Sequence, residues 1–362
     1  MRDIDRFRGC LIGGAAGDAL GYAVEFLTEA QIFARYGNGG IAAYEIENGL
    51  VRISDDTQMT LFTANGILLG AGRKQTSGIM GSYTDDIRIM YQCWYRTQTE
   101  SYPIKNESPA AWLLNIPALF STRAPGMTCL SAIRQGAGGT LEQPINQSKG
   151  CGGVMRVAPI GLYFCGTSIP YEVSDRIGAE AAALTHGHEL GFIPAAALAH
   201  IIRAVTEKDI TLKDAVTEAI AAAEKLFPRA AHLAEHTAIL QKAVLLAESA
   251  TDDLSAVHQL GEGWVAEETL AIAVYCALKY AEDFDKAICA AVNHNGDSDS
   301  TGAVCGNLLG AYLGYDAIPQ KFKDRLELHD VILEIADDLC SGCKPYRDEV
   351  WERKYIDATY PG

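Results

Sequence analysis

Helical spacing of the apolar residues is the feature that most limits what this chain can fold into. Apolar positions recur every three to four residues along most of the sequence, and the Ala-rich segments 179–183, 194–205 and 215–226 favour helix over strand. We find no segment with convincing strand character and therefore predict an all-α fold. The helices that we expect span residues 5–16, 56–69, 84–96, 153–164, 171–184, 233–248, 266–280, 301–313 and 323–339.

The organisation of the chain predicts one irregular helical bundle. No repeat of fixed period is visible, which argues against a helical solenoid. A length of 362 residues is compatible with one large domain or with two. Because no segment has the composition of a linker, we expect a single domain over residues 1–362. The longest irregular stretch, 115–152, also holds apolar residues, so we expect ordered loops that form the wall of a ligand site.

The sequence is acidic, with 30 Lys and Arg residues against 46 Asp and Glu residues and a net charge of −16. A surface of this sign repels nucleic acid and anionic lipid, so neither is expected as a main partner. We expect no apolar run to reach the ~18 residues that a membrane span needs. Residues 1–5 lack the apolar stretch of a secretory signal, and we therefore expect a cytoplasmic protein.

The 10 cysteines are scattered mainly through apolar segments, as buried thiols are in reducing compartments. We expect free thiols and no disulfide framework. The one close pair, Cys340 and Cys343, has neither a second Cys pair nor a His at zinc-finger spacing. The end of a helix at Ser341 and Gly342 is therefore favoured over a metal or redox site.

Two short segments, Ser-Asp-Asp-Thr at 54–57 and Asp-Ser-Asp-Ser-Thr at 297–301, concentrate carboxylates beside hydroxyls with little basic compensation. Each directly precedes an apolar periodic run, so each is expected where a loop enters a helix. Helix capping explains one such residue per helix. It does not explain neighbouring carboxylates at both sites, because like charges ~4 Å apart repel by about 1 kcal/mol in water and by ~4 kcal/mol at an effective dielectric of 20.

A cation between the two segments would relieve this repulsion. Asp55, Asp56, Asp297 and Asp299 supply four negative charges, which two divalent ions balance. Carboxylate, hydroxyl and water oxygens favour Mg²⁺ or Mn²⁺ over Zn²⁺. The residues therefore indicate a dinuclear metal site if the two segments meet in space, with capping and coincidence as the alternative.

Glycines recur in the segment 9–21, but no predicted strand precedes them and no Lys stands at the spacing of a phosphate-binding loop. We interpret Gly13, Gly14 and Gly17 as positions of close helix packing. Glu25 follows in a largely apolar context. It is either a surface residue or a desolvated acid/base group.

Two further segments, 123–128 and 148–156, have the form of a loop that enters a helix. Backbone amides at such a helix start, together with Ser148 and Lys149, can hold a phosphate or pyrophosphate. Either segment alone is also a common loop-to-helix turn. Both lie in or beside the long irregular stretch that we expect to form a ligand-site wall.

The histidines give no metal signature. His186 and His188 lie between two predicted helices, where a core or cap role is the default. His232 and His236 are four residues apart, but the intervening Glu does not stand at the position of the zinc protease motif. We expect these two residues to pack on a helix surface.

Taken in this order, the segments resemble the ADP-ribosylglycohydrolase family, which includes the dinitrogenase reductase-activating glycohydrolases. The resemblance runs from RGCLIGGAAGDALG at 8–21 to GDSDSTG at 296–302 and covers nearly the whole chain. It implies a compact all-α fold that holds two Mg²⁺ ions, in some members Mn²⁺, at the bottom of a cleft. The implied metal ligands, with Ser where some members have Thr, are Ser54, Asp55, Asp56, Asp297, Asp299 and Ser300.

The resemblance also implies the residues around the metals. Glu25 corresponds to the family's early acidic residue. Trp264 borders the adenosine end in this interpretation, and a core aromatic is the alternative. The loops that hold ADP-ribose correspond to Gly126, Thr128, Ser148, Lys149, Gly150, Gly152, Met155 and His186.

The activity that the resemblance implies is hydrolytic removal of ADP-ribose from protein side chains. Glu25 or Asp55 is expected as the general acid/base, and the metals with the other acidic ligands, Asp56 among them, are expected to position the ribose diol and water. The segment 123–129 is similar to a loop of the branch that acts on ADP-ribosyl-arginine. An ADP-ribosylated protein is therefore the expected substrate.

Several alternatives stay open at this point. One group of alternatives concerns the substrate, which would be ADP-ribosyl-serine, poly-ADP-ribose or O-acetyl-ADP-ribose. In another, the protein has an immunity or regulatory role and counteracts a cognate ADP-ribosyltransferase that it also binds. A third alternative is a non-catalytic ADP-ribose-binding or structural member. The runner-up enzyme is a Mg²⁺ phosphohydrolase, which would release inorganic phosphate or AMP in place of intact ADP-ribose.

Overall fold

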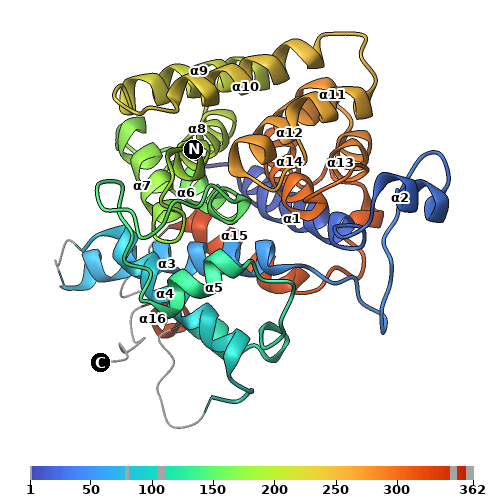
Figure 1. The fold of residues 1–362 in the computed structure, drawn as a ribbon. Helices are drawn as coiled ribbons and strands as arrows, with labels where there is room; N and C mark the ends of the chain where they lie inside the picture. Colours follow the sequence, from blue (N-terminus) through green and yellow to red (C-terminus); the bar gives the residue numbers. More distant parts are fainter. Residues whose placement is uncertain (1, 78–80, 105–110, 343–348, 356–362) are drawn as a thin grey trace.

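The protein is described by a computed structural model that covers residues 2–77, 81–104, 111–342 and 349–355, and its regular elements in these ranges are helices joined by loops (Figure 1). Regular strands are absent from the described residues, where β-bridges join only isolated residue pairs. The prediction of an all-α fold is confirmed.

Most of the predicted helices are present, several of them with longer ends. Periodicity did not predict α2, α11, α13 or α16, because helices this short give too few turns for it to show, whereas the start of α5 was expected from the loop-to-helix form of 123–128. The α-helices are α1 (Ile4–Tyr22), α2 (Glu29–Tyr36), α3 (Asp55–Ser77), α4 (Tyr83–Thr99), α5 (Met127–Arg134), α6 (Ala158–Phe164), α7 (Tyr171–Ala183), α8 (Glu189–Glu207), α9 (Leu212–Leu226), α10 (Leu233–Ala247), α11 (Asp253–Leu260), α12 (Ala266–Lys279), α13 (Phe284–Val292), α14 (Ser298–Leu313), α15 (His329–Ser341) and α16 (Glu349–Tyr355).

α1 and α14 cross at the centre of the molecule through glycines (Figure 1). A methyl group on Gly17 would overlap the carbonyl oxygen of Gly302, and Gly13 packs against α14 in the same way. The interpretation of these glycines as close-packing positions is confirmed. Farther along, Gly21 meets the carbonyl group of Ser298. The crossing therefore brings the C-terminal end of α1 to the N-terminus of α14.

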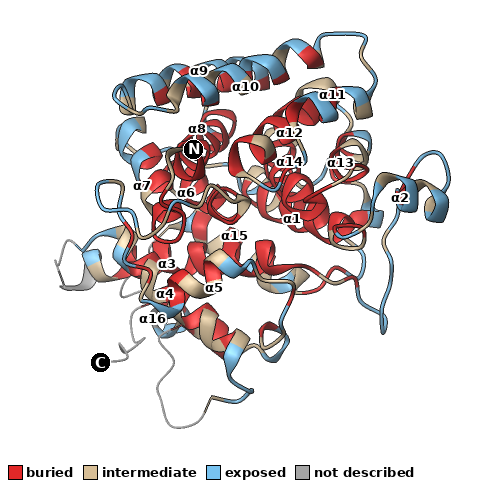
Figure 2. Cartoon of the chain, viewed as in Figure 1, coloured by how far each residue is buried: buried red, intermediate tan, exposed pale blue. Residues whose placement is uncertain are grey.

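α8 runs through the interior, whereas α9 and α10 lie across one end of the molecule with an exposed outer face (Figure 2). Among the described residues, α8 is the one helix long and apolar enough to cross a membrane, and 94% of its apolar window is buried inside the protein. The expectation that no apolar run reaches this length is therefore wrong. α8 is mainly apolar, and α6, α7, α9 and α12 pack around it, so that most of its surface lies inside the protein.

One predicted helix begins later than expected. The helix expected over 323–339 starts only with α15, because Arg325 (φ 62°) and Leu328 (φ 60°) adopt the left-handed conformation. The N–H of Val51 donates to the carbonyl oxygen of Arg325 (2.8 Å), and the N–H of Glu327 donates to that of Val51 (2.9 Å). These tertiary bonds tie the stretch to the segment before α3 and exclude a helix there.

The helix expected over 153–164 is also shorter than predicted. A 3₁₀ turn at Cys151–Gly153 comes first, and α6 begins at Ala158. Pro159 stands in the first turn of α6, where its missing N–H costs no helical hydrogen bond. The Gly-rich segment therefore stays a loop beside the helix.

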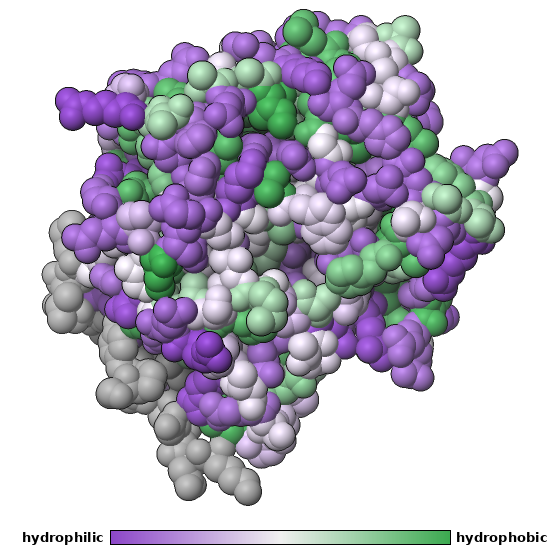
Figure 3. Space-filling view, viewed as in Figure 1, coloured by the Kyte–Doolittle hydropathy of each residue, from purple (hydrophilic) through white to green (hydrophobic). Residues whose placement is uncertain are grey.

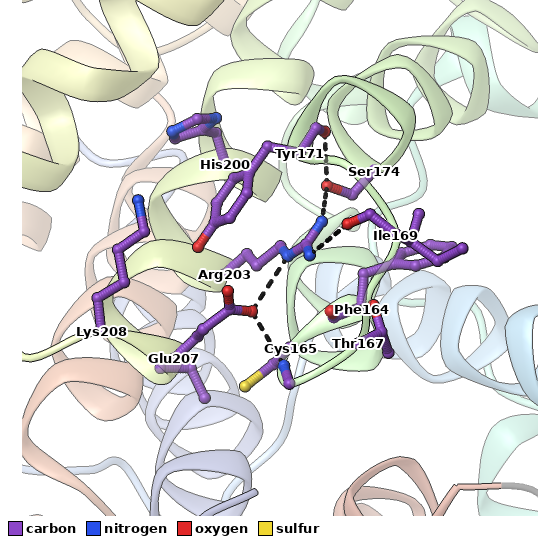
Figure 4. Close-up of polar contacts among 12 residues, drawn as sticks. Phe164, Cys165, Thr167, Ile169, Tyr171, Ser174, His200, Arg203, Glu207 and Lys208 are labelled. Carbon is purple, nitrogen blue, oxygen red and sulfur yellow. Dashed lines mark hydrogen bonds and ion pairs between the residues drawn. The ribbon is translucent and has the colours of Figure 1, made fainter. Parts of the chain in front are cut away.

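A cluster of charged and aromatic side chains fastens the start of α7 to the end of α8 (Figure 4). This Arg203 cluster consists of Tyr171, Ser174, Arg203, Glu207 and Lys208. Buried Arg203 donates to Ser174 Oγ (3.0 Å), to a main-chain carbonyl (2.7 Å) and to Glu207 Oε2 (3.3 Å). Its guanidinium and the Lys208 ammonium lie 4.1 and 4.5 Å from the centre of the Tyr171 ring. Lys208 also pairs with a carboxylate of α9.

The described cysteines are all free thiols. α15 ends at Ser341, and Gly342 follows with a φ of 68°, so the predicted helix end is confirmed. Cys343, the second member of the close pair, lies outside the described residues. The expectation of no disulfide framework holds for the part of the chain that the structure describes.

Candidate active site

The two acidic segments meet where α3 and α14 begin. The hydroxyl of Ser300 donates a hydrogen bond to Oδ2 of Asp56, 2.8 Å away. The two residues are 244 positions apart in the sequence. The condition on which the metal hypothesis depended, that the segments meet in space, is therefore met.

Capping accounts for one residue at each of the two helices. Ser54 Oγ accepts from the N–H of Asp56 (3.1 Å), and a carboxylate oxygen of Asp297 accepts from the N–H of Ser300 (3.3 Å). The carboxylates of Asp55 and Asp56 take no part in these two caps, although both are buried. The capping alternative therefore leaves most of the acidic groups unexplained.

A cavity of about 230 Å³ lies at this junction. Pale and green side chains gather near the middle of the face in Figure 3, and hydrophilic side chains cover much of the rest of that face. Carboxylates form the floor of the cavity, and no described Lys or Arg side chain lines it. The lining residues are Glu25, Asp55, Asp56, Ala124, Gly126, Met127, Thr128, Cys129, Gly150, Cys151, Gly152, Met155, His186, Trp264, Asp297, Asp299 and Ser300.

Burial without a counter-charge raises the pKa values of the carboxyl groups. Burial first, and then the charges of Asp299 and Asp297, raise the pKa of Glu25 to about 10. Burial followed by the charge of Asp299 also raises the pKa values of Asp55 and Asp56 well above their ordinary range. Without a cation, protons therefore neutralise part of the cluster.

Glu25 is the desolvated acid of the two sequence-based alternatives, and the surface alternative is wrong. It is 8% exposed, and its Oε2 is buried without a hydrogen-bond partner. One carboxylate oxygen each of Glu25, Asp297 and Asp299 lies within 4.8 Å of the other two. These three groups have the mutual spacing that a single cation requires.

Asp18 is a buried carboxylate of this region that the sequence analysis missed. It lies on α1, and its oxygens accept hydrogen bonds from the N–H groups of Ser54 (2.9 Å) and Thr57 (3.1 Å), so it caps α3 from a neighbouring helix. Burial and the charge of Asp299 raise its pKa to about 7. Its position in the sequence could have revealed it, because a carboxylate inside the apolar segment 9–21 is expected to be buried and to need hydrogen-bond partners.

The predicted ADP-ribose loops form a wall of the cavity. Gly126 and Thr128 line it at the start of α5, and Gly150, Gly152 and Met155 line it from the Gly-rich turn. The N-cap of α5 is Gly126, which has no side chain, so no cap side chain accepts from the first backbone N–H groups of the helix. Such a helix start attracts an anionic group.

Three predicted site residues do not line the cavity. Ser148 Oγ lies 3.3 Å from Thr128 Oγ1 and braces the wall. The ammonium group of Lys149 pairs with the buried carboxylate of Glu267. Ser54 is fully enclosed and serves as the cap described above.

His186 lines the cavity as an uncharged ring. Its Nδ1 lies 2.8 Å from Thr185 Oγ1, and Arg156 donates to the same hydroxyl (2.7 Å). Burial, followed by the positive charge of Arg156, lowers the pKa of His186 to about 3. The residue therefore offers a polar ring without a positive charge at neutral pH.

His188, His232 and His236 do not line the cavity. His188 caps α8 by accepting from the N–H of Leu190 (3.0 Å), as expected. His232 lies at the surface and contacts Glu235 (2.8 Å). The surface expectation is wrong for His236, which is fully buried because it shares the apolar face of α10 with Leu240.

Arg123 and Glu327 form a buried ion pair that holds the wall of the cavity. Nη2 of Arg123 donates to Oε1 of Glu327 (2.6 Å). The Arg123 carbonyl accepts from the N–H of Asp55 (3.0 Å), and Glu327 Oε2 accepts from the N–H of Ile53 (3.3 Å). The pair thus joins the loop before α5 to the segment before α3. No local sequence pattern predicts this pair, because its partners are 204 residues apart.

The donor atoms at the junction suit a hard divalent cation. The charged donors of the acidic segments are carboxylate oxygens, with the Ser300 hydroxyl and the sulfur atoms of Cys151 and Met155 beside them, and no described Lys or Arg side chain lines the cavity to balance them. Oxygen donors with excess negative charge favour Mg²⁺ or Mn²⁺. The residues that would hold such ions are Asp55, Asp56, Asp297, Asp299 and Ser300, with Glu25 beside them.

The fold and the cavity define an all-α enzyme with an acidic centre at the meeting of two helix starts. The chain belongs to the ADP-ribosylglycohydrolase family, whose profile matches residues 1–349, and it is a glycosidase of that family. It is 24% identical to ADP-ribosylhydrolase ARH3 of Danio rerio, over 96% of this chain and 93% of the relative.

Two further comparisons agree with this assignment. The chain is 25% identical to the ADP-ribosyl-dinitrogen reductase glycohydrolase of Rhodospirillum rubrum, over 90% of this chain and 91% of the relative. A solved chain of an ADP-ribosylglycohydrolase-related protein complex is 25% identical, with a TM-score of 0.59 over 93% of this chain and 98% of that chain. The similarity therefore extends along nearly the whole protein.

Proposed function

We propose that this protein is a Mg²⁺-dependent hydrolase that releases ADP-ribose from ADP-ribosylated arginine side chains of proteins. The observation that carries the proposal is the contact between Ser300 and Asp56, which joins two acidic helix starts into one buried cluster at a cavity that no described Lys or Arg side chain lines. Two Mg²⁺ ions, replaceable by Mn²⁺, would balance the four Asp charges of that cluster. The family and the names of the two relatives support the ADP-ribose chemistry.

The cavity suits the terminal part of ADP-ribose. The ribose diol faces the carboxylates of the floor, and the pyrophosphate lies against the backbone of Gly150, Gly152 and the start of α5. A volume of about 230 Å³ leaves the adenosine outside the enclosed part. The neutral His186 ring fits this assignment, because it contacts the nucleotide without a charge.

Glu25 is placed to exchange a proton with the reacting groups. Its carboxyl group is buried, and Oε2 is free to take a new partner. Mg²⁺ held by the acidic segments would orient the diol and lower the pKa of a bound water. Its positive charge would also lower the pKa of Glu25, which burial and the neighbouring carboxylates raise to about 10, and so favour a general acid/base role. Asp55 is the alternative base, and the surrounding carboxylates stabilise the cation-like sugar.

The proposal that arginine is the linked residue depends on the loop 123–129. The ion pair between Arg123 and Glu327 holds the backbone of this loop in place. Mass spectrometry of the products from a panel of substrates tests it: one carrier protein modified on arginine or on serine, poly-ADP-ribose, and O-acetyl-ADP-ribose. We expect intact ADP-ribose from the arginine-linked substrate, and none in EDTA. Phosphate or AMP would indicate a phosphohydrolase, and no product from any substrate would indicate a non-catalytic binding role.

We place this activity in the cytoplasm, in agreement with the free thiols of the described residues. The regulatory form of the proposal, in which the protein counteracts a cognate ADP-ribosyltransferase, is tested by co-purification with that transferase. A stable complex would support the regulatory role. Hydrolysis of many modified proteins without such a complex would favour general removal of ADP-ribose.

A further inference from the structure

An exposed aromatic pair stands at the mouth of the cavity. Phe26 is 72% exposed and Trp264 is 42% exposed. Their rings are 25° from parallel, with centroids 6.5 Å apart. The alternative of Trp264 as a core aromatic is therefore wrong. Large aromatic side chains left at the surface of a cavity mark a place where a partner binds.

Backbone contacts hold this aromatic pair beside the carboxylates. Phe26 directly follows Glu25 in the chain, and Trp264 itself lines the cavity. The carbonyl oxygen of Trp264 accepts from the N–H of Cys151 (3.2 Å), and the neighbouring Gly263 packs against Asp297. The pair is thus next to the groups that handle the scissile bond.

The charges around the aromatic pair favour a cationic partner. The floor of the cavity is acidic, and Glu262, two residues before Trp264, adds an exposed carboxylate. The basic side chains closest to the wall in the sequence already have partners, because Lys149 pairs with Glu267 and Arg123 with a carboxylate near α15. The rings therefore offer their faces to a cation that the described residues do not supply.

We propose that Phe26 and Trp264 form a platform for the guanidinium group of the ADP-ribosylated arginine, so that they recognise the leaving group and not the nucleotide. A guanidinium is planar and cationic, and it stacks on aromatic faces more readily than an ammonium does. A serine linkage offers neither the plane nor the charge. The inference rests on the proposed function, because it names the residues that select arginine.

The test compares Phe26→Ala, Trp264→Ala and Trp264→Phe with Leu245→Ala, a control in an exposed apolar residue of α10 outside the cavity lining. KM and kcat are measured on one peptide ADP-ribosylated either on arginine or on serine, and calorimetry gives the Kd of free ADP-ribose. The two Ala variants at the platform are expected to raise KM for the arginine-linked peptide about five- to tenfold, the size of a cation–π contact. Their kcat and ADP-ribose Kd, and all values for the Leu245→Ala control, should stay within twofold of wild type, whereas Trp264→Phe, which keeps an aromatic face, should raise KM less than Trp264→Ala does.

A weaker ADP-ribose Kd in the Ala variants would overturn the inference, because the pair would then bind the nucleotide. An unchanged KM on the arginine-linked peptide would overturn it as well. If wild type cleaves no arginine-linked substrate, the proposed function fails, and the platform is judged by binding of that peptide in EDTA. Binding that Phe26→Ala weakens would still support the platform, and equal binding by both proteins would contradict it.

Discussion

The acidic site and the Arg203 cluster are both polar groups that helices enclose, and they differ in how their charges are balanced. In the Arg203 cluster, the guanidinium and the ammonium meet carboxylates, a hydroxyl, a carbonyl and an aromatic face. In the acidic site, carboxylates face one another across a cavity that no described basic side chain lines. A balanced cluster is complete as structure, whereas an unbalanced one needs a ligand.

The largest effect should come from removing one charge of the acidic site. Asp55→Asn and Asp297→Asn are each expected to lower ADP-ribose release more than 10³-fold, because each removes a proposed metal ligand. Asn still caps α14 in place of Asp297, so folding should survive. Thermal unfolding in EDTA should show equal or higher stability, since a repulsive buried charge is gone. Wild-type activity in either variant would contradict the metal assignment.

The opposite result is expected in the Arg203 cluster. Arg203→Met leaves buried partners without their cation and should lower the free energy of unfolding by about 3 kcal/mol, with kcat within twofold of wild type. Arg176→Met is the matched control: Arg176 forms exposed ion pairs and should cost less than about 1 kcal/mol. Urea denaturation measures both. A large loss of kcat in soluble Arg203→Met would show that the cluster is not purely structural.

The raised pKa values predict that stability without metal falls as pH rises. The ordinary pKa values of Asp and Glu are 3.8 and 4.5, whereas in the folded protein Asp18 titrates at about 7 and Glu25 at about 10. The stabilising contribution is complete below the ordinary values and is lost as pH rises through the folded ones. Thermal unfolding in EDTA from pH 5 to 9 should therefore show a decline that Glu25→Gln reduces and Mg²⁺ opposes. An equal decline in Glu25→Gln would refute this assignment.

The smallest effect concerns Ser54, which caps α3 and is also one of the implied metal ligands. Ser54→Ala removes the hydroxyl that caps α3 and should lower the free energy of unfolding by about 1 kcal/mol in EDTA. If Ser54 also binds metal, the stabilisation by Mg²⁺ should shrink in the variant. If it only caps the helix, that stabilisation should equal the wild-type value. Denaturation with and without Mg²⁺ separates the two roles.

Much of the site was predictable because its signals are local. Each acidic segment stands directly before an apolar run, and that pattern alone predicted two helix starts with excess carboxylates. Close packing at Gly13 and Gly17 was likewise visible from spacing. The all-α fold followed from the same periodicity, which long helices display over several turns.

The parts that were missed depend on partners far away in the sequence. Asp18 is a site residue only because α1 carries it to the start of α3, and Arg123 finds Glu327 across 204 residues. The late start of α15 has the same origin, since Val51 holds the preceding stretch through backbone bonds that no local pattern encodes. Tertiary contacts override local propensity at these places.

Titration of Mg²⁺ into metal-free protein by calorimetry tests the central claim most directly, because it measures the ligand that the unbalanced carboxylates require. The account predicts that wild type binds two Mg²⁺ ions per chain and releases protons as it does so, which is measured as a dependence of the binding heat on the buffer. It predicts weaker or incomplete binding for Asp297→Asn. No binding by wild type, or binding that Asp297→Asn leaves unchanged, would contradict it.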